Sequence, residues 1–466
     1  MEFITQLVNQ VNSLLWDELL IFLLCGTGIY YTLRLGFIQI RHFKSGFKAL
    51  FSGISLSGAK ADKQGMSSFQ AVATAIAGQV GTGNLAGPAT AIIAGGPGAI
   101  FWMWVSSFLG MATIYAEAML AQKFRSKDKN GQVVGGPAYY IEKGLNCKWL
   151  ACIFSVLVII ALGFIGNMVQ SNSIAAAFNS SLGVPGWVIG IILALITGVV
   201  IMGGISSIAS FTEKVVPIKA VFYLLGTLVI LVHNAHYILP AFKSIFVAAF
   251  NPTAVLGGGA GIAIQQAMRF GIARGLFSNE AGMGSTPHAH AVAKVERPEQ
   301  QGYIAMMGVF VVCVIVTLTA LAIITSGMSM WELDGKTQAN FLGVFTGQGI
   351  AVTQQAYTYV YGYFGSLFIS VSLFFFAFST IVGWYYYGEM NIRYLFNSQR
   401  AVRAYQLMVI AFIFIASFFK VELVWNMADM FNGLMVLPNL IALILLSPIV
   451  IKMSKLVGGK VAVNPN

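Results

Sequence analysis

A succession of apolar segments, each about 20 residues long, limits the possible folds of this chain more than any other feature of its sequence. A helix needs about 20 residues to cross the hydrocarbon core of a bilayer. Apolar residues make up 57% of the 466 positions and charged residues only 9%, whereas a soluble domain carries about 25% charged residues. The composition therefore predicts an all-α, polytopic membrane protein.

The apolar segments predict about eleven membrane spans within a single transmembrane domain of residues 1–466. The connections between them are too short to hold a soluble domain. The expected spans are 15–37, 67–94, 97–122, 149–178, 186–204, 213–232, 259–291, 302–326, 356–388, 404–419 and 424–450.

The basic residues predict the orientation of the chain. When the N-terminus is placed outside, most of the 27 lysine and arginine residues fall on the other side, Lys214 and Lys219 among them. Basic residues concentrate in cytoplasmic loops, so we expect a multi-pass protein of the cell membrane with a cytoplasmic C-terminus. This distribution accounts for the net charge of +11. We expect contact with the lipid bilayer and no nucleic-acid partner.

Two predicted spans contain glycine-rich stretches that interrupt a helix. They read GQVGTGNLAGP, from Gly78 to Pro88, and GLFSNEAGMGSTP, from Gly275 to Pro287. Freed backbone groups cost several kcal/mol each in lipid, so irregular backbone is tolerated where it lines a cavity or binds a ligand. Close packing of small residues between helices is the alternative. Because two breaks occur, and Glu280 lies within one of them, a transport site is favoured.

The positions of the breaks predict an inverted repeat. They lie five spans apart, and a unit of five spans crosses the bilayer an odd number of times. A second copy must therefore enter from the opposite face. We expect an extra N-terminal helix at 15–37, a first repeat at 67–232 and a second repeat at 259–450.

An enzyme is not expected from the motifs of this chain. GQVGTGN has neither the following Lys-Ser/Thr nor the preceding strand of a phosphate-binding loop. No catalytic triad and no cluster of metal ligands can be identified. We expect no cofactor beyond a coupling ion.

The two breaks also carry a resemblance to a known family. GQVGTGN followed by LAGPATAI, together with GLFSNEAGMGSTPHAHA, resembles the signature segments of the sodium:alanine symporter family, and the likeness extends through essentially the whole chain. The resemblance implies the leucine-transporter fold and sodium-coupled symport of a small neutral amino acid, alanine or glycine, by alternating access. A proton-coupled carrier, in which Glu280 titrates, and a cation channel along the breaks are the alternatives.

A zwitterionic amino acid needs an anion site, a cation site and a pocket of matching size. Amides near Thr82 and Gly83, at the start of a half-helix, can bind a carboxylate. Gln79 can bind the substrate or a freed backbone group. Trp384 is expected as a bulky wall that excludes larger substrates, unless it lies at the lipid interface. The expected substrate-binding residues are Gln79, Thr82, Gly83, Phe164, Asn167, Phe277, Ser278, Asn279 and Trp384.

The resemblance further implies a sodium site between the first broken helix and a later helix. The later helix contributes a Ser-Thr pair, although such a pair in a membrane helix otherwise bonds its own backbone. The expected sodium ligands are the carbonyls of Ala77, Val80 and Phe376, the hydroxyls of Ser379 and Thr380 and, for a second sodium, the side chain of Asn84.

Two acidic residues fall within predicted spans, where a carboxylate is costly and usually functional. Glu280 can pair with Arg274 or Arg269, accept the substrate ammonium, or brace the break by accepting backbone N–H groups. We expect the bracing role. Glu117 is expected to have a structural or gating role.

Overall fold

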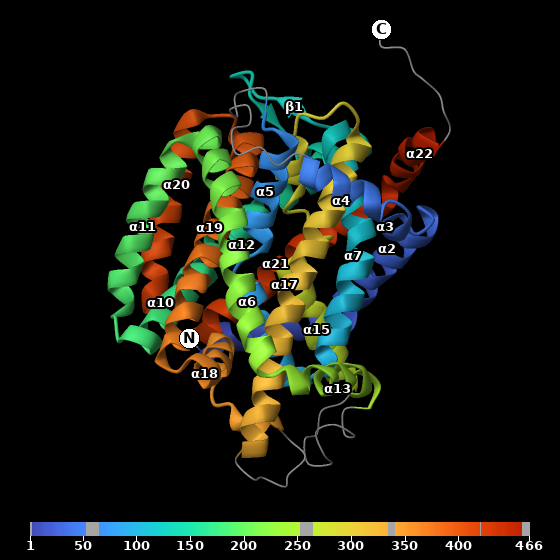
Figure 1. The fold of residues 1–466 in the computed structure, drawn as a ribbon. Helices are drawn as coiled ribbons and strands as arrows, with labels where there is room; N and C mark the ends of the chain where they lie inside the picture. The colour runs from blue at the N-terminus through green and yellow to red at the C-terminus, as the bar shows by residue number, and fades with distance from the viewer. Residues whose placement is uncertain (1, 53–64, 252–263, 334–340, 420, 459–466) are drawn as a thin grey trace.

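Helices dominate the residues that the computed structural model describes, which are 2–52, 65–251, 264–333, 341–419 and 421–458 (Figure 1). A helix bonds its own amides and carbonyls within one segment, which lipid requires of a spanning chain. Among these residues, eight helices are long and apolar enough to cross a membrane: Thr5–Arg34, Gly98–Lys123, Lys148–Leu182, Gly204–His233, Pro298–Leu333, Tyr363–Phe396, Gln399–Phe418 and Glu422–Leu445. The prediction of an all-α, polytopic membrane protein is confirmed.

The first half of the chain contains α1 (Glu2–Ser13), η1 (Leu14–Leu19), α2 (Leu20–Arg34), α3 (Ile38–Arg41), α4 (Phe43–Ser52), α5 (Ser68–Gln79), α6 (Thr82–Gly95), α7 (Gly98–Lys123), β1 (Ser126–Lys127), β2 (Val133–Val134), α8 (Pro137–Leu145), α9 (Lys148–Val158), η2 (Ile159–Gly166), α10 (Asn167–Leu182), α11 (Gly186–Met202), α12 (Gly204–His233), η3 (Ala235–Tyr237) and α13 (Ile238–Phe250). The second half contains α15 (Ile264–Asn279), α16 (Pro287–Ala291), α17 (Pro298–Leu333), η4 (Phe341–Val344), α18 (Ile350–Tyr361), α19 (Tyr363–Phe396), α20 (Gln399–Ile415), η5 (Ala416–Phe418), α21 (Val421–Leu445) and α22 (Ser447–Gly458). Strands β1 and β2 pair antiparallel, with Ser126 opposite Val134.

Each of the eleven predicted spans has a helical counterpart. Two are interrupted as expected: α5 and α6 form the span 67–94, and α15 and α16 form the span 259–291, whose first residues lie outside the described part of the chain. The predicted span 356–388 is divided at Gly362, whose φ of +60° separates α18 from α19.

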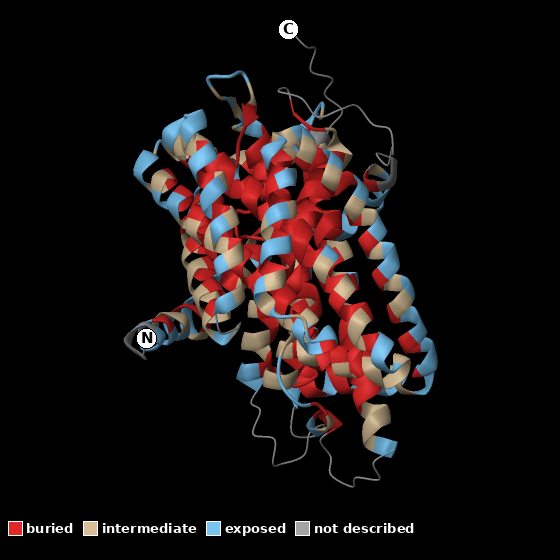
Figure 2. Cartoon of the chain, turned by 90° about the vertical axis from the view of Figure 1, so that its left-hand side faces the viewer, coloured by how far each residue is buried: buried red, intermediate tan, exposed pale blue. Residues whose placement is uncertain are grey.

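The burial pattern suits a protein surrounded by lipid. Buried residues fill the interior along the length of the bundle, and exposed residues lie on its outer helices (Figure 2). Large apolar side chains are among the exposed ones, including Leu195 at 67% and Val199 at 77% on α11. Which end faces the cytoplasm, and the division into two repeats, stay predictions.

Helix α5 brings the first break into the centre of the bundle. It begins at a capping box, in which Ser67 Oγ accepts from the Gln70 amide at 3.0 Å and Gln70 Oε1 accepts from the Ser67 amide at 3.0 Å. From there α5 packs against α12, α17 and α19, while α6 packs against α15 and α17. The break between α5 and α6 is therefore enclosed by helices from both halves of the chain.

Candidate functional site

The first break separates α5 from α6 at Val80 and Gly81. Asn84 closes it, because its Oδ1 accepts from the Gly81 amide at 2.9 Å. The first amides of a helix lack helical acceptors, and Gln170 of α10 supplies one. Its Oε1 accepts from the Thr82 amide at 3.0 Å and from Thr82 Oγ1 at 2.7 Å.

The second break runs from Glu280 to Thr286, between α15 and α16. The φ angles of Glu280 (56°), Gly282 (89°) and Gly284 (77°) are all positive, so the segment follows no helical path. Glu117 of α7 accepts from the Gly282 amide at 3.1 Å and from the Gly284 amide at 3.0 Å. The bracing of freed backbone amides that we expected of Glu280 is therefore performed by Glu117.

The Glu280 carboxylate binds side chains instead. It accepts from Trp384 Nε1 at 2.6 Å and from Ser285 Oγ at 2.5 Å. Neither arginine that we considered as its partner pairs with it. Arg274 binds Asp429 at 2.6 Å and Arg269 binds Asp17 at 2.5 Å. Glu280 thus fixes the orientation of the Trp384 ring.

Direct hydrogen bonds join the two breaks. Gln79 Nε2 donates to the Asn279 carbonyl at 2.7 Å, and Asn84 Nδ2 donates to Ser278 Oγ at 2.8 Å. The alternative expectation for Gln79, a bond to freed backbone, is thus realised by its amide nitrogen. All four side chains are buried. Residues about 200 positions apart in the sequence therefore form one polar centre inside the apolar bundle.

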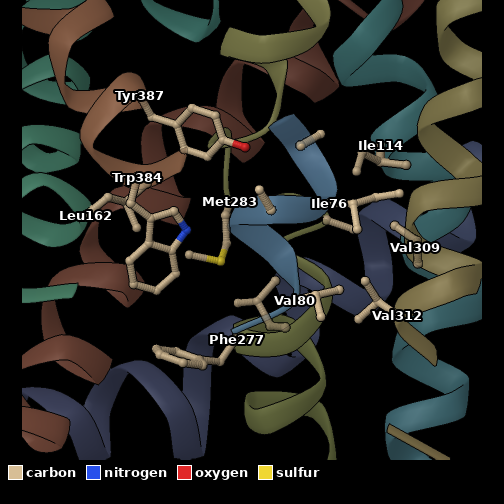
Figure 3. Close-up of a cluster of buried hydrophobic side chains, with 14 of the residues drawn as sticks. Ile76, Val80, Ile114, Leu162, Phe277, Met283, Val309, Val312, Trp384 and Tyr387 are labelled. Atoms are coloured by element: carbon tan, nitrogen blue, oxygen red, sulfur yellow. The ribbon is translucent and has the colours of Figure 1, made fainter. Parts of the chain in front are cut away.

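Trp384 forms a wall beside this centre. Its ring lies edge-to-face with Phe277, 5.9 Å between ring centroids, and both side chains lie close to the unwound segment at Met283 (Figure 3). A Cβ at Gly166 would lie 2.5 Å from Trp384 Cζ3, so the ring is held closely from η2 as well. Trp384 is 1% exposed, which excludes the lipid-interface alternative.

Phe164 is the one expected pocket residue that the structure turns away from the breaks. Its ring packs against Tyr405 and Phe412 of α20, with centroids 5.6 and 4.8 Å away. Asn167, which we expected on the same helix face, is fully buried and donates through Nδ2 to the Gly163 carbonyl at 3.1 Å.

Three buried amide side chains among the residues described above each keep one polar atom unpaired. Gln79 Oε1, Asn167 Oδ1 and Gln170 Nε2 have no hydrogen-bond partner among the described residues. A buried polar atom without a partner costs about 1–3 kcal/mol. The unpaired donor of Gln170 and the unpaired acceptor of Gln79, whose other polar atoms bond the breaks, suit a ligand that carries both charges.

The expected sodium ligands meet where α5 contacts α19. Thr380 Oγ1 donates to the Ala77 carbonyl at 2.8 Å, and Ser379 Oγ donates to the Phe376 carbonyl at 2.8 Å. The Ser-Thr pair therefore bonds both its own helix and the first broken helix. We call the contact formed by Ala77, Val80, Phe376, Ser379 and Thr380 the α5–α19 joint.

Lys219 of α12 reaches the same joint. Its Nζ donates to the Val80 carbonyl at 2.8 Å and to Ser379 Oγ, and it lies 5.0 Å from the centre of the Phe376 ring. The side chain is 2% exposed, so the expectation that Lys219 belongs to a cytoplasmic surface is wrong. Its position inside the predicted span 213–232, five residues beyond Lys214, was the sequence signal that could have identified it.

Asn439 of α21 is a second residue that sequence reasoning missed. Its Nδ2 donates to Glu117 Oε1 at 2.7 Å and to the Gly282 carbonyl at 2.9 Å. It therefore supports both the bracing carboxylate and the unwound segment. An asparagine after Pro438 in an apolar helix gives little indication of such a partner from sequence.

A cavity of about 710 Å³ lies beyond the breaks, between α6, α10, α15, α18 and α21. Arg274 and Trp425 line it, and the Arg274 guanidinium lies 5.3 Å from the Trp425 ring centre. Trp425 in turn packs on Phe277 at 5.1 Å. Phe277 is thus the layer between this cavity and the polar centre at the breaks.

Comparison with known proteins places this geometry in context. The chain matches the model of the sodium:alanine symporter family over residues 1–458. The sodium/alanine symporter AgcS of Methanococcus maripaludis is 44% identical over 98% of this chain and 97% of its own length. The probable sodium/glutamine symporter GlnT of Bacillus subtilis is 40% identical over 96% of this chain and 90% of its own length. The crystal structure of MhsT with L-phenylalanine matches 86% of this chain and 99% of MhsT with a TM-score of 0.57 at 13% identity, which shows a shared fold.

We predict that Gly81→Ala destabilises the protein. The added methyl group would overlap Thr380 Oγ1 and lie 2.9 Å from Gln170 Oε1. Overpacking of this kind costs about 1–3 kcal/mol, which should lower the thermal unfolding midpoint of the purified protein. Gly87→Ala is the matched control on α6, because its Cβ would meet nothing within 4 Å. Equal midpoints for the two variants would contradict the close packing at the first break.

We predict that Glu117→Gln exposes the second break to solvent exchange. A glutamine retains one acceptor oxygen, so one of the two glycine amides loses its partner, at a cost of about 1–3 kcal/mol. Hydrogen–deuterium exchange in the peptide spanning 280–287 should accelerate about tenfold or more. Glu18→Gln, at an exposed position, should leave that peptide unchanged. Unaltered exchange in Glu117→Gln would remove Glu117 from the bracing role.

Proposed function

The chain belongs to the sodium:alanine symporter family, and on that premise we propose that it carries alanine, and glycine as a second substrate, across the cell membrane by alternating access. It is a multi-pass, sodium-coupled transporter and no enzyme. We place the substrate site at the two breaks because a pair of hydrogen bonds joins the two broken helices there. A substrate site formed by both breaks changes its geometry when either half of the protein moves.

The carboxylate of the substrate would bind at the start of α6. Anions bind at helix N-termini because the first amides point outward and the helix dipole favours negative charge. The Thr82 amide is already bonded to Gln170, so Gly83 supplies the amide, and the free Nε2 of Gln170 supplies a second donor. A Cβ at Gly83 would lie 2.8 Å from Phe277 Cδ1, which explains why the smallest residue stands there.

The ammonium group of the substrate would bind at the end of α15. The helical partners of the Phe277 and Ser278 carbonyls would be the amides of residues 281 and 282. These donate elsewhere, to Asn279 Oδ1 at 3.0 Å and to Glu117 at 3.1 Å. The two carbonyls are therefore available at the negative end of a helix, and Gln79 Oε1 adds a third acceptor.

Selectivity for a small side chain follows from the rigidity of Trp384. The ring is fixed by Glu280 on one side and by Phe277 and Gly166 on others, so it cannot rotate away without breaking these contacts. A wall of this kind excludes larger substrates by steric clash.

Sodium would bind at the α5–α19 joint, where two carbonyls and two hydroxyls of the expected set converge. Oxygen ligands of this kind suit a hard cation. Since the joint links the first broken helix to a helix of the other half, sodium would favour the arrangement in which the substrate site is assembled. Asn84, bonded to Gly81 and Ser278, is retained as a ligand of a second sodium.

We assign the 710 Å³ cavity to the outer side of the membrane, because the predicted orientation of the chain places that end of the bundle outside.

Uptake of labelled alanine into proteoliposomes tests the function, and two substitutions at the joint test the ion site. We expect uptake to require an inward sodium gradient. Ser379→Ala with Thr380→Ala should raise the sodium concentration for half-maximal uptake about tenfold or more, because two of the oxygen ligands are lost.

Ser372→Ala is the matched control, since Ser372 lies buried on α19 and its hydroxyl has no partner among the described residues. It should keep the sodium dependence of the wild type. Uptake driven equally by a proton gradient without sodium would replace sodium coupling with proton coupling. An unchanged sodium requirement in the double variant would move the ion site elsewhere.

We predict that Trp384→Phe broadens the range of substrates. The smaller ring enlarges the pocket and loses the bond to Glu280, and one methylene of extra room changes discrimination about 10–200-fold. Leucine, which should not compete with alanine in the wild type, should inhibit alanine uptake by the variant. Trp187→Phe, at an exposed position, should retain the wild-type pattern. Equal exclusion of leucine by both variants would show that another residue sets the size limit.

A further inference from the structure

We propose that a clamp between the start of α5 and the end of α16 closes the protein on the side away from the 710 Å³ cavity, and that this clamp opens in each transport cycle to release alanine and sodium. The inference rests on the proposed function, because it assumes that the chain transports by alternating access.

Two backbone hydrogen bonds form the centre of the clamp. The Met66 amide donates to the Val292 carbonyl at 3.0 Å, and the Lys294 amide donates to the Met66 carbonyl at 2.9 Å. Met66 thereby pairs with Ala293 in a parallel bridge. An added Cβ at Gly65 would overlap the Val292 carbonyl oxygen, so the two segments approach each other closely. Met66 lies two residues before α5 and Ala293 two residues after α16, so the bridge joins half-helices that belong to different breaks.

Gln122 of α7 holds the α16 side of the bridge. Its Nε2 donates to the His290 carbonyl at 2.5 Å and to the Ala293 carbonyl at 3.0 Å. The last carbonyls of a helix lack helical donors, and Gln122 supplies donors at the end of α16. Arg125, just beyond α7, donates to Gln122 Oε1 and to the Ala293 carbonyl, both at 3.0 Å. The α5–α16 clamp thus consists of Met66, Gln122, Val292, Ala293 and Lys294.

The clamp and the cavity involve different halves of the two broken helices. The cavity is lined from α6, by Ala86 and Thr90 among others, and from α15, by Phe270 and Arg274. None of the described lining residues belongs to α5 or α16. Helix α16 packs on α5 instead, and α5 lies toward the end of the bundle that carries β1, whereas α6 and α15 lie toward the other end (Figure 1). The protein is therefore hollow on one side of the breaks and closed on the other.

A carrier of this shape releases its ligands by exchanging its open and closed sides, and the clamp is built to be exchanged. The bridge is isolated, with one residue pair in place of the ladder of a sheet. A backbone hydrogen bond that is replaced by a bond to water changes the free energy by little. A few bonds of this kind can hold one state closed and still open within a transport cycle.

Helix α5 connects the clamp to the proposed sodium site. Met66 precedes the first residue of α5, and Ala77 and Val80 lie at its other end. A short helix moves as a rigid element, so sodium that ties Ala77 to α19 also keeps Met66 beside Ala293. Loss of sodium would free α5 and allow the clamp to open.

A reversible cross-link tests the inference. Neighbouring strands lie about 4.8 Å apart, and a disulfide needs Cα atoms about 4.4–6.8 Å apart, so Met66→Cys with Ala293→Cys should form a disulfide on oxidation. The oxidised double variant in proteoliposomes should lose about tenfold or more of its sodium-driven alanine uptake, because the clamp can no longer open. The same protein, purified, should still bind labelled alanine in the presence of sodium, since the cavity side stays accessible. A reductant should restore uptake.

The single variants Met66→Cys and Ala293→Cys, oxidised in the same way, are the controls for the four native cysteines and for the loss of each side chain. Both should keep their uptake under oxidation. Mass spectrometry of the double variant reports whether the disulfide has formed. Full uptake with the disulfide formed would overturn the inference. A disulfide that does not form would overturn it as well, because the two residues would then not be neighbours.

Gln122→Leu provides a second test. Without the Gln122 donors the clamp should open more often, which lowers the fraction of molecules that can bind alanine from the cavity side. The apparent Kd for alanine is inversely proportional to that fraction and should rise about threefold or more. Addition of the oxidised Met66–Ala293 cross-link to Gln122→Leu should restore the wild-type Kd. Gln399→Leu, at an exposed position, is the matched control and should keep that Kd throughout.

An unchanged Kd in Gln122→Leu, or a raised Kd that the cross-link does not restore, would contradict the role of Gln122 in the clamp. Failure of the proposed function gives a different result. Wild-type protein that takes up no alanine, or takes it up without sodium, would contradict the proposed function whatever the cross-link does. Sodium-driven uptake by the wild type that persists in the cross-linked variant would overturn the clamp alone.

Discussion

Backbone amides and carbonyls that leave a helix at membrane depth need new partners, and this requirement organises the centre of the protein. The first break is satisfied by Asn84 and Gln170, and the second by Glu117 with Asn439 beside it. These side chains come from α6, α10, α7 and α21. Helices from the whole chain are thus tied to two short unwound segments. A rearrangement of either segment must change hydrogen bonds in several helices together, as a transporter with alternating access requires.

The same requirement couples the ion site to the substrate site. Val80 and Gly81 end α5 at the joint with α19, and α6 begins one residue later with the amides proposed for the substrate carboxylate. An ion that fixes the end of α5 also fixes the start of α6. Gln79, which bonds the Asn279 carbonyl, extends this constraint to the second break. Coupling between sodium and substrate then needs no long pathway, because sodium would bind on one side of the first break and the substrate on the other.

Sequence reasoning located the breaks and the spans because these depend on local properties, namely apolar length and glycine content. The expected residues of the joint came from the family resemblance. Sequence reasoning failed for contacts that depend on the direction in which a side chain points. Phe164 and Asn167 are three positions apart, which predicts a shared face on a regular helix, but the π-helical turn at Ile159–Gly166 shifts the register, and Phe164 faces α20. Glu280 was expected to brace the freed amides, but Glu117 does so, since the sequence does not show which carboxylate meets them.

Lys219 illustrates how a single charge can be misread from a count of basic residues. A lysine near the end of a predicted span counts toward the positive-inside rule, yet α12 extends back to Gly204 and places this one in the bundle. Once it is buried, its N–H donors need oxygen acceptors, and such atoms converge at the α5–α19 joint. The two buried carboxylates at the second break are held by neutral donors, so neither neutralises Lys219. The bonds of Lys219 to the Val80 carbonyl and to Ser379 Oγ link α12 to both α5 and α19, so the joint connects three helices.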